Sequence, residues 1–182
     1  GTGKTSISFQ VICAYANANP DKKILAIDVC PQANLSELFL GGLEGKGGDN
    51  LLKVQGSFRA TLGGYFEKRM SIPFEKPDFA NMPLADFITI PVKYNANIPS
   101  NINLLCGDPI LELQSNAVST LANTQIPGVN TWIRVIDWIK DLISSSNEYD
   151  ICFVDTNPSF SIYTQMSIAA SNKLILPVMA DD

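Results

Sequence analysis

The sequence contains no histidine among its 182 residues. Without imidazole the chain lacks the commonest general base, which excludes Ser–His and Cys–His nucleophile pairs and most zinc sites. Basic residues are also few, because 13 lysines and arginines stand against 18 aspartates and glutamates, a net charge of −5. This balance argues against a nucleic-acid surface that follows phosphates within these residues.

Long hydrophobic runs are absent as well. A membrane span needs roughly 18 apolar residues, whereas the run Leu174–Ala180 has only the length of a strand and contains Pro177. We therefore expect no membrane association. The hydrophobic fraction of 46% is nevertheless enough for a sizeable core, so the chain is not of the disordered class. Its length indicates one domain over residues 1–182.

The four cysteines form no CxxC pair. Cys13, Cys106 and Cys152 lie in apolar segments, which is typical of buried, reduced thiols in a cytoplasmic protein. Cys30 differs, because it lies in a polar turn. The chain begins without methionine, at Gly1, and neither end has the pattern of a signal peptide. We expect a segment of a longer protein, truncated at both ends.

Hydrophobic spacing predicts the elements of an α/β fold. Helices are predicted over residues 4–18, 57–70, 109–121, 131–143 and 160–170, with Gly63 and Gly64 interrupting the segment 57–70. Residues 31–40 are predicted to form a turn and then a short helix. Continuous apolar runs, typical of strands buried on both faces, occur over residues 23–28, 101–106, 151–155 and 173–178. Asn34 or Ser36 is expected to cap the second helix. The alternation predicts a doubly wound, mainly parallel sheet flanked by helices.

Two segments interrupt this alternation. Residues 41–48 have the composition of a glycine-rich loop. Residues 51–100 contain five prolines, which indicates an irregular excursion rather than a second domain.

The first six residues, GTGKTS, match the second half of the P-loop pattern GxxxxGK[ST]. Glycines allow backbone N–H groups to curve around phosphate oxygens, and the start of a helix adds its positive dipole end. In such a loop Lys4 reaches the β- and γ-phosphates and the Thr5 hydroxyl holds Mg²⁺. The motif alone is weak, because a plain turn into a helix gives the same few residues by chance.

Two aspartates strengthen the nucleotide hypothesis. Asp28 and Asp155 each end an apolar run that predicts a strand. In an open α/β sheet, ligands bind beyond the carboxyl ends of the strands. Either aspartate alone is more often a turn former or a helix cap, but the phosphate loop and both carboxylates together predict one nucleotide site.

Three blocks together resemble the ParA/Soj-type partition ATPases of the MinD/ParA superfamily, which are P-loop ATPases with a deviant Walker A motif. Residues 1–6 are similar to the end of KGGxGKT[ST]. Residues 28–36, DVCPQANLS, resemble the first switch, DxDPQGN-x-[ST]. Residues 149–159, YDICFVDTNPS, resemble the Walker B and second-switch segment, YDxxxIDxPPS. The resemblance covers nearly the whole chain, most loosely over residues 51–100, and PQxN is its most specific element.

The resemblance implies a Mg²⁺-dependent ATPase with a P-loop NTPase fold. The site residues that it implies are Lys4 and Asp28 for catalysis, Gly1, Thr2, Gly3, Lys4, Thr5 and Ser6 for the ATP phosphates, Thr5 as a Mg²⁺ ligand and Asp155 as a Mg²⁺ contact through water. It also implies an ATP-dependent homodimer that binds DNA non-specifically, through residues outside this span. A ParB-like partner protein would stimulate hydrolysis, and the cycle would partition plasmids or chromosomes on the nucleoid, in the cytoplasm.

Some positions depart from the family pattern. The signature lysine would fall two positions before Gly1, with the P-loop strand before it, and both lie outside this chain. Cys30 stands at the second aspartate of DxDPQ, and Asn157 at the first proline of the PP pair. Since a thiol does not orient an attacking water as a carboxylate does, Cys30 favours an alternative, a dimerisation switch that hydrolyses ATP slowly.

Two relatives with other cargo remain as alternatives. A MinD-like membrane-positioning ATPase would need an amphipathic helix in the residues that follow this span. A relative of the nitrogenase iron protein would need cluster-binding cysteines in loops, whereas Cys106 and Cys152 lie in predicted strands.

Overall fold

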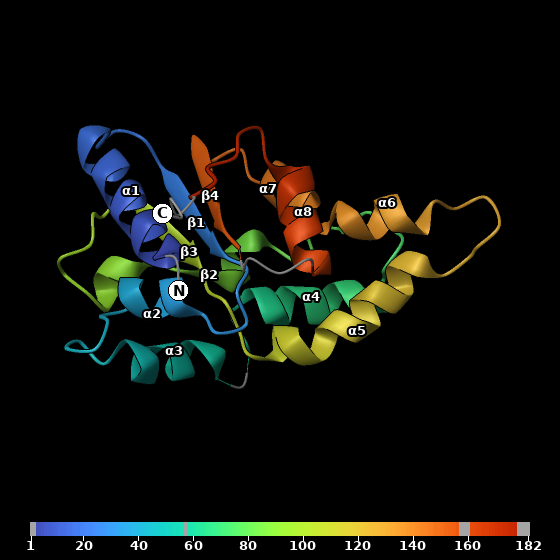
Figure 1. Ribbon diagram of the computed structural model, residues 1–182, viewed down its shortest axis with the longest axis horizontal. Coiled ribbons are helices and arrows are strands. Elements are labelled where there is room, and N and C mark those ends of the chain that lie inside the picture. Colours follow the sequence, from blue (N-terminus) through green and yellow to red (C-terminus); the bar gives the residue numbers. More distant parts are fainter. Residues whose placement is uncertain (1–2, 57, 157–160, 178–182) are drawn as a thin grey trace, which may run out of the picture.

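A computed structural model describes residues 3–56, 58–156 and 161–177, and its ribbon shows a central sheet with helices on both faces (Figure 1). The strands, in sheet order, are β2 (Ile88–Thr89), β3 (Ile102–Leu105), β1 (Ile24–Asp28) and β4 (Ile151–Asp155). β1 pairs in parallel with both β3 and β4, and β2 runs antiparallel to β3. The prediction of a mainly parallel α/β sheet is confirmed.

Eight α-helices surround the sheet in the described part of the chain. They are α1 (Lys4–Ala18), α2 (Asn34–Phe39), α3 (Gly47–Gln55), α4 (Leu62–Ser71), α5 (Ile110–Asn123), α6 (Thr131–Ile136), α7 (Trp138–Ser144) and α8 (Ile162–Ala170). Two short 3-10 helices, η1 (Leu84–Phe87) and η2 (Pro91–Lys93), flank β2. No helix among the described residues is long and apolar enough to cross a membrane.

The core lies on both faces of the sheet, which explains the continuous apolar run of β1. Ile24 and Ala26 pack with residues of α1, α2 and α3 on one face. Leu25 and Ile27 pack on the other face with residues of α4, α5, α7 and α8. Because successive side chains of a strand point to opposite faces, every position of β1 is buried.

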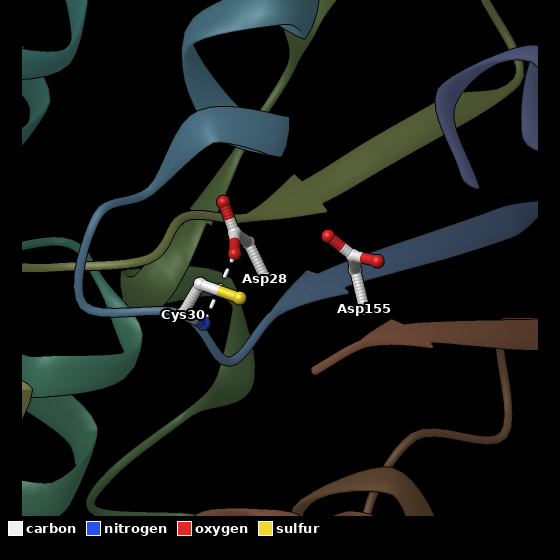
Figure 2. Close-up of side chains that lie close together, drawn as sticks. All are labelled: Asp28, Cys30 and Asp155. Carbon is white, nitrogen blue, oxygen red and sulfur yellow. Dashed lines mark hydrogen bonds between the residues drawn. The ribbon is translucent and has the colours of Figure 1, made fainter. Parts of the chain in front are cut away.

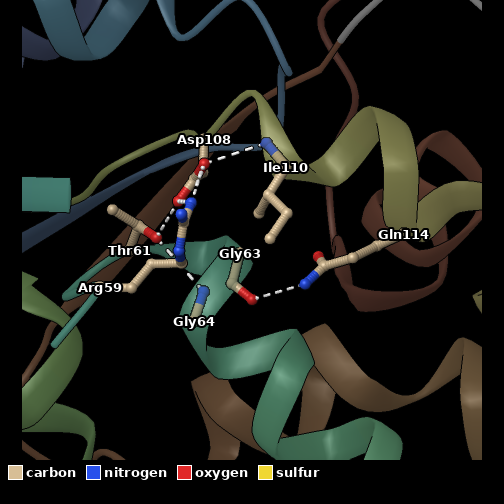
Figure 3. A network of polar contacts seen from close by, with 7 residues as sticks. All are labelled: Arg59, Thr61, Gly63, Gly64, Asp108, Ile110 and Gln114. Carbon is tan, nitrogen blue, oxygen red and sulfur yellow. Dashed lines mark hydrogen bonds and ion pairs between the residues drawn. The ribbon is translucent and has the colours of Figure 1, made fainter. Parts of the chain in front are cut away.

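A polar network joins α4 to the loop that precedes α5 (Figure 3). Asp108, whose side chain is 1% exposed, accepts hydrogen bonds from Arg59 at 2.8 and 2.9 Å and from the Thr61 hydroxyl at 2.6 Å. Asp108 also accepts from the backbone N–H of Ile110 at 3.0 Å. Thr61 in turn caps α4 by accepting from the N–H of Gly64. The network therefore fixes the first turns of both helices against each other.

Several predicted element boundaries were wrong. The single helix over 131–143 is two helices that meet at Asp137, where ψ is 0°. The predicted loop 41–48 contains the start of α3, which follows Lys46 in the left-handed region at φ 55°. Within residues 51–100, α4 begins only at Leu62, after its Thr61 cap. These boundaries depend on backbone conformations that hydrophobic spacing does not report.

The strand expected over residues 173–178 is also wrong for its described part. Residues 173–177 form no strand, and residue 178 lies outside the described residues. Leu174, Ile175 and Leu176 are 57%, 69% and 78% exposed. β4 pairs with β1 along one edge, and no strand in the described chain pairs with its other edge. An apolar run without such a neighbour has no ladder to join.

Candidate nucleotide site

The segment expected to bind phosphates, residues 1–6, runs into the first turn of α1. Gly3 precedes α1 in the left-handed region at φ 66°, a conformation that favours glycine, and a Cβ built on it would meet nothing within 4 Å. No side chain caps this end of the helix. Lys4 and Thr5 are partly buried and Ser6 is exposed, while Gly1 and Thr2 lie outside the described residues. The start of α1 thus offers uncapped N–H groups beside open space, as an anion requires.

Asp28 and Asp155 are partners across two neighbouring strands. They end β1 and β4, which are parallel and pair Asp28 with Asp155 in register. Both side chains are buried, at 0% and 5% exposure. The predicted meeting of the two strand ends at one edge of the sheet is therefore observed.

The carboxylate of Asp155 is only half satisfied. Its Oδ1 accepts a hydrogen bond of 2.6 Å from the hydroxyl of Ser8 in α1. Its Oδ2 is buried and has no hydrogen-bond partner among the described residues. A buried, unpaired carboxylate oxygen is costly, and a cation or a metal-bound water would satisfy it. These residues therefore fit the Mg²⁺ that the family resemblance implies.

Asp28 is fully satisfied by hydrogen bonds. It accepts from the N–H of Cys30 at 3.1 Å, from the N–H of Ser36 at 2.9 Å and from the hydroxyl of Ser36 at 2.8 Å. Burial is the main cause that raises the pKa of the Asp28 carboxyl, and the charge of Asp155 adds to the rise. The hydrogen bonds lower the pKa, and the net value is about 6 instead of 3.8. Asp28 is thus a buried carboxyl, held by three hydrogen bonds, whose pKa lies above its ordinary value.

The side chain of Cys30 points toward the carboxylates of Asp28 and Asp155 (Figure 2). Cys30 is 7% exposed. Its Sγ atom, one carboxylate oxygen of Asp28 and one carboxylate oxygen of Asp155 all lie within 4.8 Å of one another. Burial raises the pKa of the Cys30 thiol far above its ordinary range, and the charges of Asp28 and Asp155 add to this. The positive charge of Lys4 acts in the opposite direction, which places Lys4 within electrostatic reach of the cluster.

Three residues that hold the site were missed by sequence reasoning. Ser8 lies one turn after Lys4 on the same face of α1, and this spacing was the available signal. Asn34 or Ser36 was expected to cap α2, and this prediction was wrong. Ala33, at φ 51°, precedes α2, and no side chain caps the helix. The Ser36 hydroxyl binds Asp28 instead.

Gly107 is the third missed residue, and it lies two residues after the end of β3. Its N–H donates to the Ser36 hydroxyl at 2.9 Å. A Cβ at Gly107 would lie 2.6 Å from the carbonyl oxygen of Cys30 and 3.0 Å from Cγ of Asp28. Only glycine allows the loop after β3 to approach the loop after β1 this closely.

A cavity of about 420 Å³ lies beside the carboxylates. Its lining comes from the loop after β1, from α5, from Thr156 and from the start of α8. The lining includes Val29 and Thr156, which follow Asp28 and Asp155 in the chain, but none of Lys4, Asp28, Cys30 and Asp155. Asn157, the other departure from the family pattern, lies outside the described residues.

Comparisons with known proteins give a family and a shared fold. A family model described as an AAA domain matches residues 1–182, whereas the comparison with curated proteins gives no match. Among solved structures, the chain is similar to the ATP complex of a Cyanothece McdA variant at 21% identity and a TM-score of 0.60, covering 97% of this chain and 52% of that one.

Two further structures show the same fold. A putative plasmid partition protein from Borrelia burgdorferi B31 bound to AMPPNP is 18% identical, with a TM-score of 0.59 and coverage of 97% of this chain and 57% of that one. Protein DIP2308 from Corynebacterium diphtheriae is 21% identical, with a TM-score of 0.57 and coverage of 93% and 55%. The chain spans about half the length of these structures. It belongs to the AAA-domain family whose model matches residues 1–182, and it shares its fold with these solved structures.

Proposed function

We propose that the chain forms the Mg²⁺- and ATP-binding part of a ParA-like partition ATPase. The observation that carries the proposal is the buried, unpaired Oδ2 of Asp155, beside Asp28 and within the reach of α1. A carboxylate held in this way at a strand end, facing a helix start, suits a hydrated cation and the phosphates that it accompanies.

In this proposal each residue has a defined task. Gly1 through Ser6 donate N–H groups to the phosphates, and Lys4 offsets their negative charge. When bound, Mg²⁺ would neutralise charge on the β- and γ-phosphates, with Thr5 as a direct ligand and Asp155 binding through water. The hydrogen bond from Ser8 keeps Asp155 at the correct angle. Asp28, held by Ser36 and Cys30, orients the attacking water.

The wider cycle is part of the same proposal. ATP binding would bring two copies together as a homodimer, the dimer would bind DNA non-specifically outside this span, and a ParB-like protein would stimulate hydrolysis. Nucleotide in two of the similar structures, ATP with McdA and AMPPNP with the Borrelia protein, supports the ATP site. Plasmid or chromosome partition on the nucleoid, in the cytoplasm, is the role that this cycle would serve.

One observation favours a slower variant of this function. The Cys30 thiol is neutral and buried between two carboxylates, where a third carboxylate is typical of the family. A neutral thiol is a weak acceptor for water. The ATP-bound dimer would then be long-lived, and the protein would act mainly as an ATP-dependent dimerisation switch.

Lys4→Ala tests the proposal directly. Loss of the ammonium group leaves phosphate charge uncompensated, so we expect binding of a fluorescent ATP analogue to weaken at least about tenfold, which is roughly 1.4 kcal/mol. Light scattering with ATP should show monomers only. Lys53→Ala is the matched control, because Lys53 is exposed and its ammonium group donates to the Asn50 side chain within the same helix, α3. Unchanged affinity and unchanged dimerisation in Lys4→Ala would refute the assignment.

A further inference from the structure

The cluster of Asp28, Cys30 and Asp155 contains a donor that Mg²⁺–ATP does not use. All three residues are buried, and their ligand atoms lie within 4.8 Å of one another. Figure 2 shows the Cys30 sulfur and a carboxylate oxygen of Asp155 pointing into the space between the three side chains. A second observation points to a ligand there, since Oδ2 of Asp155 is buried and unpaired among the described residues.

The donor set selects a particular class of metal. Zn²⁺ binds thiolate at about 2.3 Å and carboxylate at about 2.0–2.2 Å in tetrahedral sites, which puts neighbouring ligand atoms roughly 3.5 Å apart. Separations of up to 4.8 Å therefore need a closure of about 1 Å, within reach of side-chain rotation. Mg²⁺ prefers six oxygen ligands and gives up its waters reluctantly, so it does not use the sulfur.

We propose that the nucleotide-free protein binds one Zn²⁺ ion, or a similar divalent metal ion such as Co²⁺, directly through the carboxylates of Asp28 and Asp155 and the thiolate of Cys30. The thiol proton is released to solvent as the sulfur–metal bond forms, and the dication offsets three negative donors that would otherwise repel one another. A fourth position stays open for water or a phosphate oxygen. This binding is separate from the proposed ATPase activity and would compete with the Mg²⁺ arrangement at Asp155.

Cobalt is the probe for this site. We expect Co²⁺, added to the purified protein without nucleotide, to give visible bands typical of tetrahedral coordination and a near-ultraviolet sulfur-to-cobalt charge-transfer band. Zn²⁺ should displace it. In Cys30→Ser the charge-transfer band should disappear and Co²⁺ affinity should fall at least about tenfold, the lower end of what even indirect ligand changes cost. Cys13→Ser, which alters a partly buried thiol of α1, should keep both.

Further variants keep the outcomes distinct. Asp155→Asn should weaken Co²⁺ binding while retaining the charge-transfer band, since the sulfur is still present. Lys4→Ala should retain the band even where ATP binding is lost, which separates this proposal from the nucleotide assignment. Circular dichroism verifies that each variant is folded. A charge-transfer band that persists in Cys30→Ser, one that is lost in Cys13→Ser, or the absence of any band in the unaltered protein overturns the proposal.

Discussion

Cys30 is the residue at which this chain departs most informatively from its family. Its thiol occupies the position where the first-switch pattern has a second aspartate, and it is buried beside Asp28 and Asp155. Water-positioning or general-base groups typically contribute ~10²–10⁴-fold to a reaction rate. A neutral thiol would forgo most of that contribution, and this is the reason for the proposal of slow hydrolysis.

We therefore expect Cys30→Asp to raise the single-turnover rate of ATP hydrolysis at least about tenfold under saturating Mg²⁺. The measurement follows phosphate release from pre-bound ATP, with and without DNA. Cys30→Ser, which is nearly isosteric and uncharged, should keep the low rate. An unchanged or lower rate in Cys30→Asp would mean that Asp28 or a partner-supplied group already positions the water and that Cys30 serves only in packing.

The buried carboxyl of Asp28 should make the stability of the protein depend on pH. Because the folded carboxyl holds its proton up to about pH 6, whereas an unfolded aspartate releases it near pH 3.9, the folded state binds more protons between these values. Its contribution to stability is thus complete below about pH 4 and is lost as the pH rises through about 6.

Asp28→Asn removes this titration. Measured without nucleotide or metal, the free energy of unfolding of the unaltered protein should fall relative to Asp28→Asn by up to about 3 kcal/mol between pH 4 and pH 7. The amide in Asp28→Asn would place its NH₂ group near the N–H groups of Cys30 or Ser36, which lowers the stability of the variant. This loss does not depend on pH, so it does not affect the comparison of the two pH profiles. Parallel pH profiles for the two proteins would contradict the burial-raised pKa.

Among the elements, α4 and α5 depend on one buried carboxylate. Asp108 accepts hydrogen bonds from Arg59, from Thr61 and from the N–H of Ile110 at the start of α5, as Figure 3 shows. The Arg59 side chain is 34% exposed, so it can return to water when its partner is removed, which limits the loss. Asp108→Asn should lower the free energy of unfolding by about 1.5–3 kcal/mol, the range for a hydrogen bond to a charged group.

Urea unfolding measures this effect, and Asp86→Asn is the control. Asp86 is an exposed aspartate in η1, and its amide variant should stay within about 0.5 kcal/mol of the unaltered protein. If Asp108→Asn proves as stable as the control, the network contributes nothing net to the junction of α4 and α5.

At the scale of the whole molecule, the alternation of strands and helices was predictable from continuous apolar runs, although only β1 is buried at every position and β4, at the edge of the described sheet, is partly buried before Asp155. The apolar runs that end at Asp28 and Asp155 correspond directly to β1 and β4, and their parallel pairing then placed both carboxylates together. The helix α1 was also predicted, but its buried face was not: Ile7 and Val11 are 40% and 38% exposed, whereas Ile12 and Ala16 are buried. The predicted features depend on hydrophobic spacing alone.

What sequence could not predict depends on contacts between distant segments. Ser36 looked like a helix cap, but its hydroxyl binds a strand end eight residues earlier. The exposed run at Leu174–Leu176 has the composition of a strand, yet a strand exists only where another strand pairs with it. Asp137 divides one periodic segment into two helices through its backbone angles, which leave no hydrophobic signature.

The position of the Ser36 hydroxyl has a consequence for how the site is connected to the helices around it. This single oxygen donates to Asp28 and accepts from the N–H of Gly107, and Gly107 is bonded to Asp108, which holds the start of α4. Since a Cβ at Gly107 would collide with the turn at Cys30, the two loops have no free space to slide past each other. The strand end at the site is therefore linked, through one hydroxyl and one peptide bond, to the carboxylate that holds the first turns of α4 and α5.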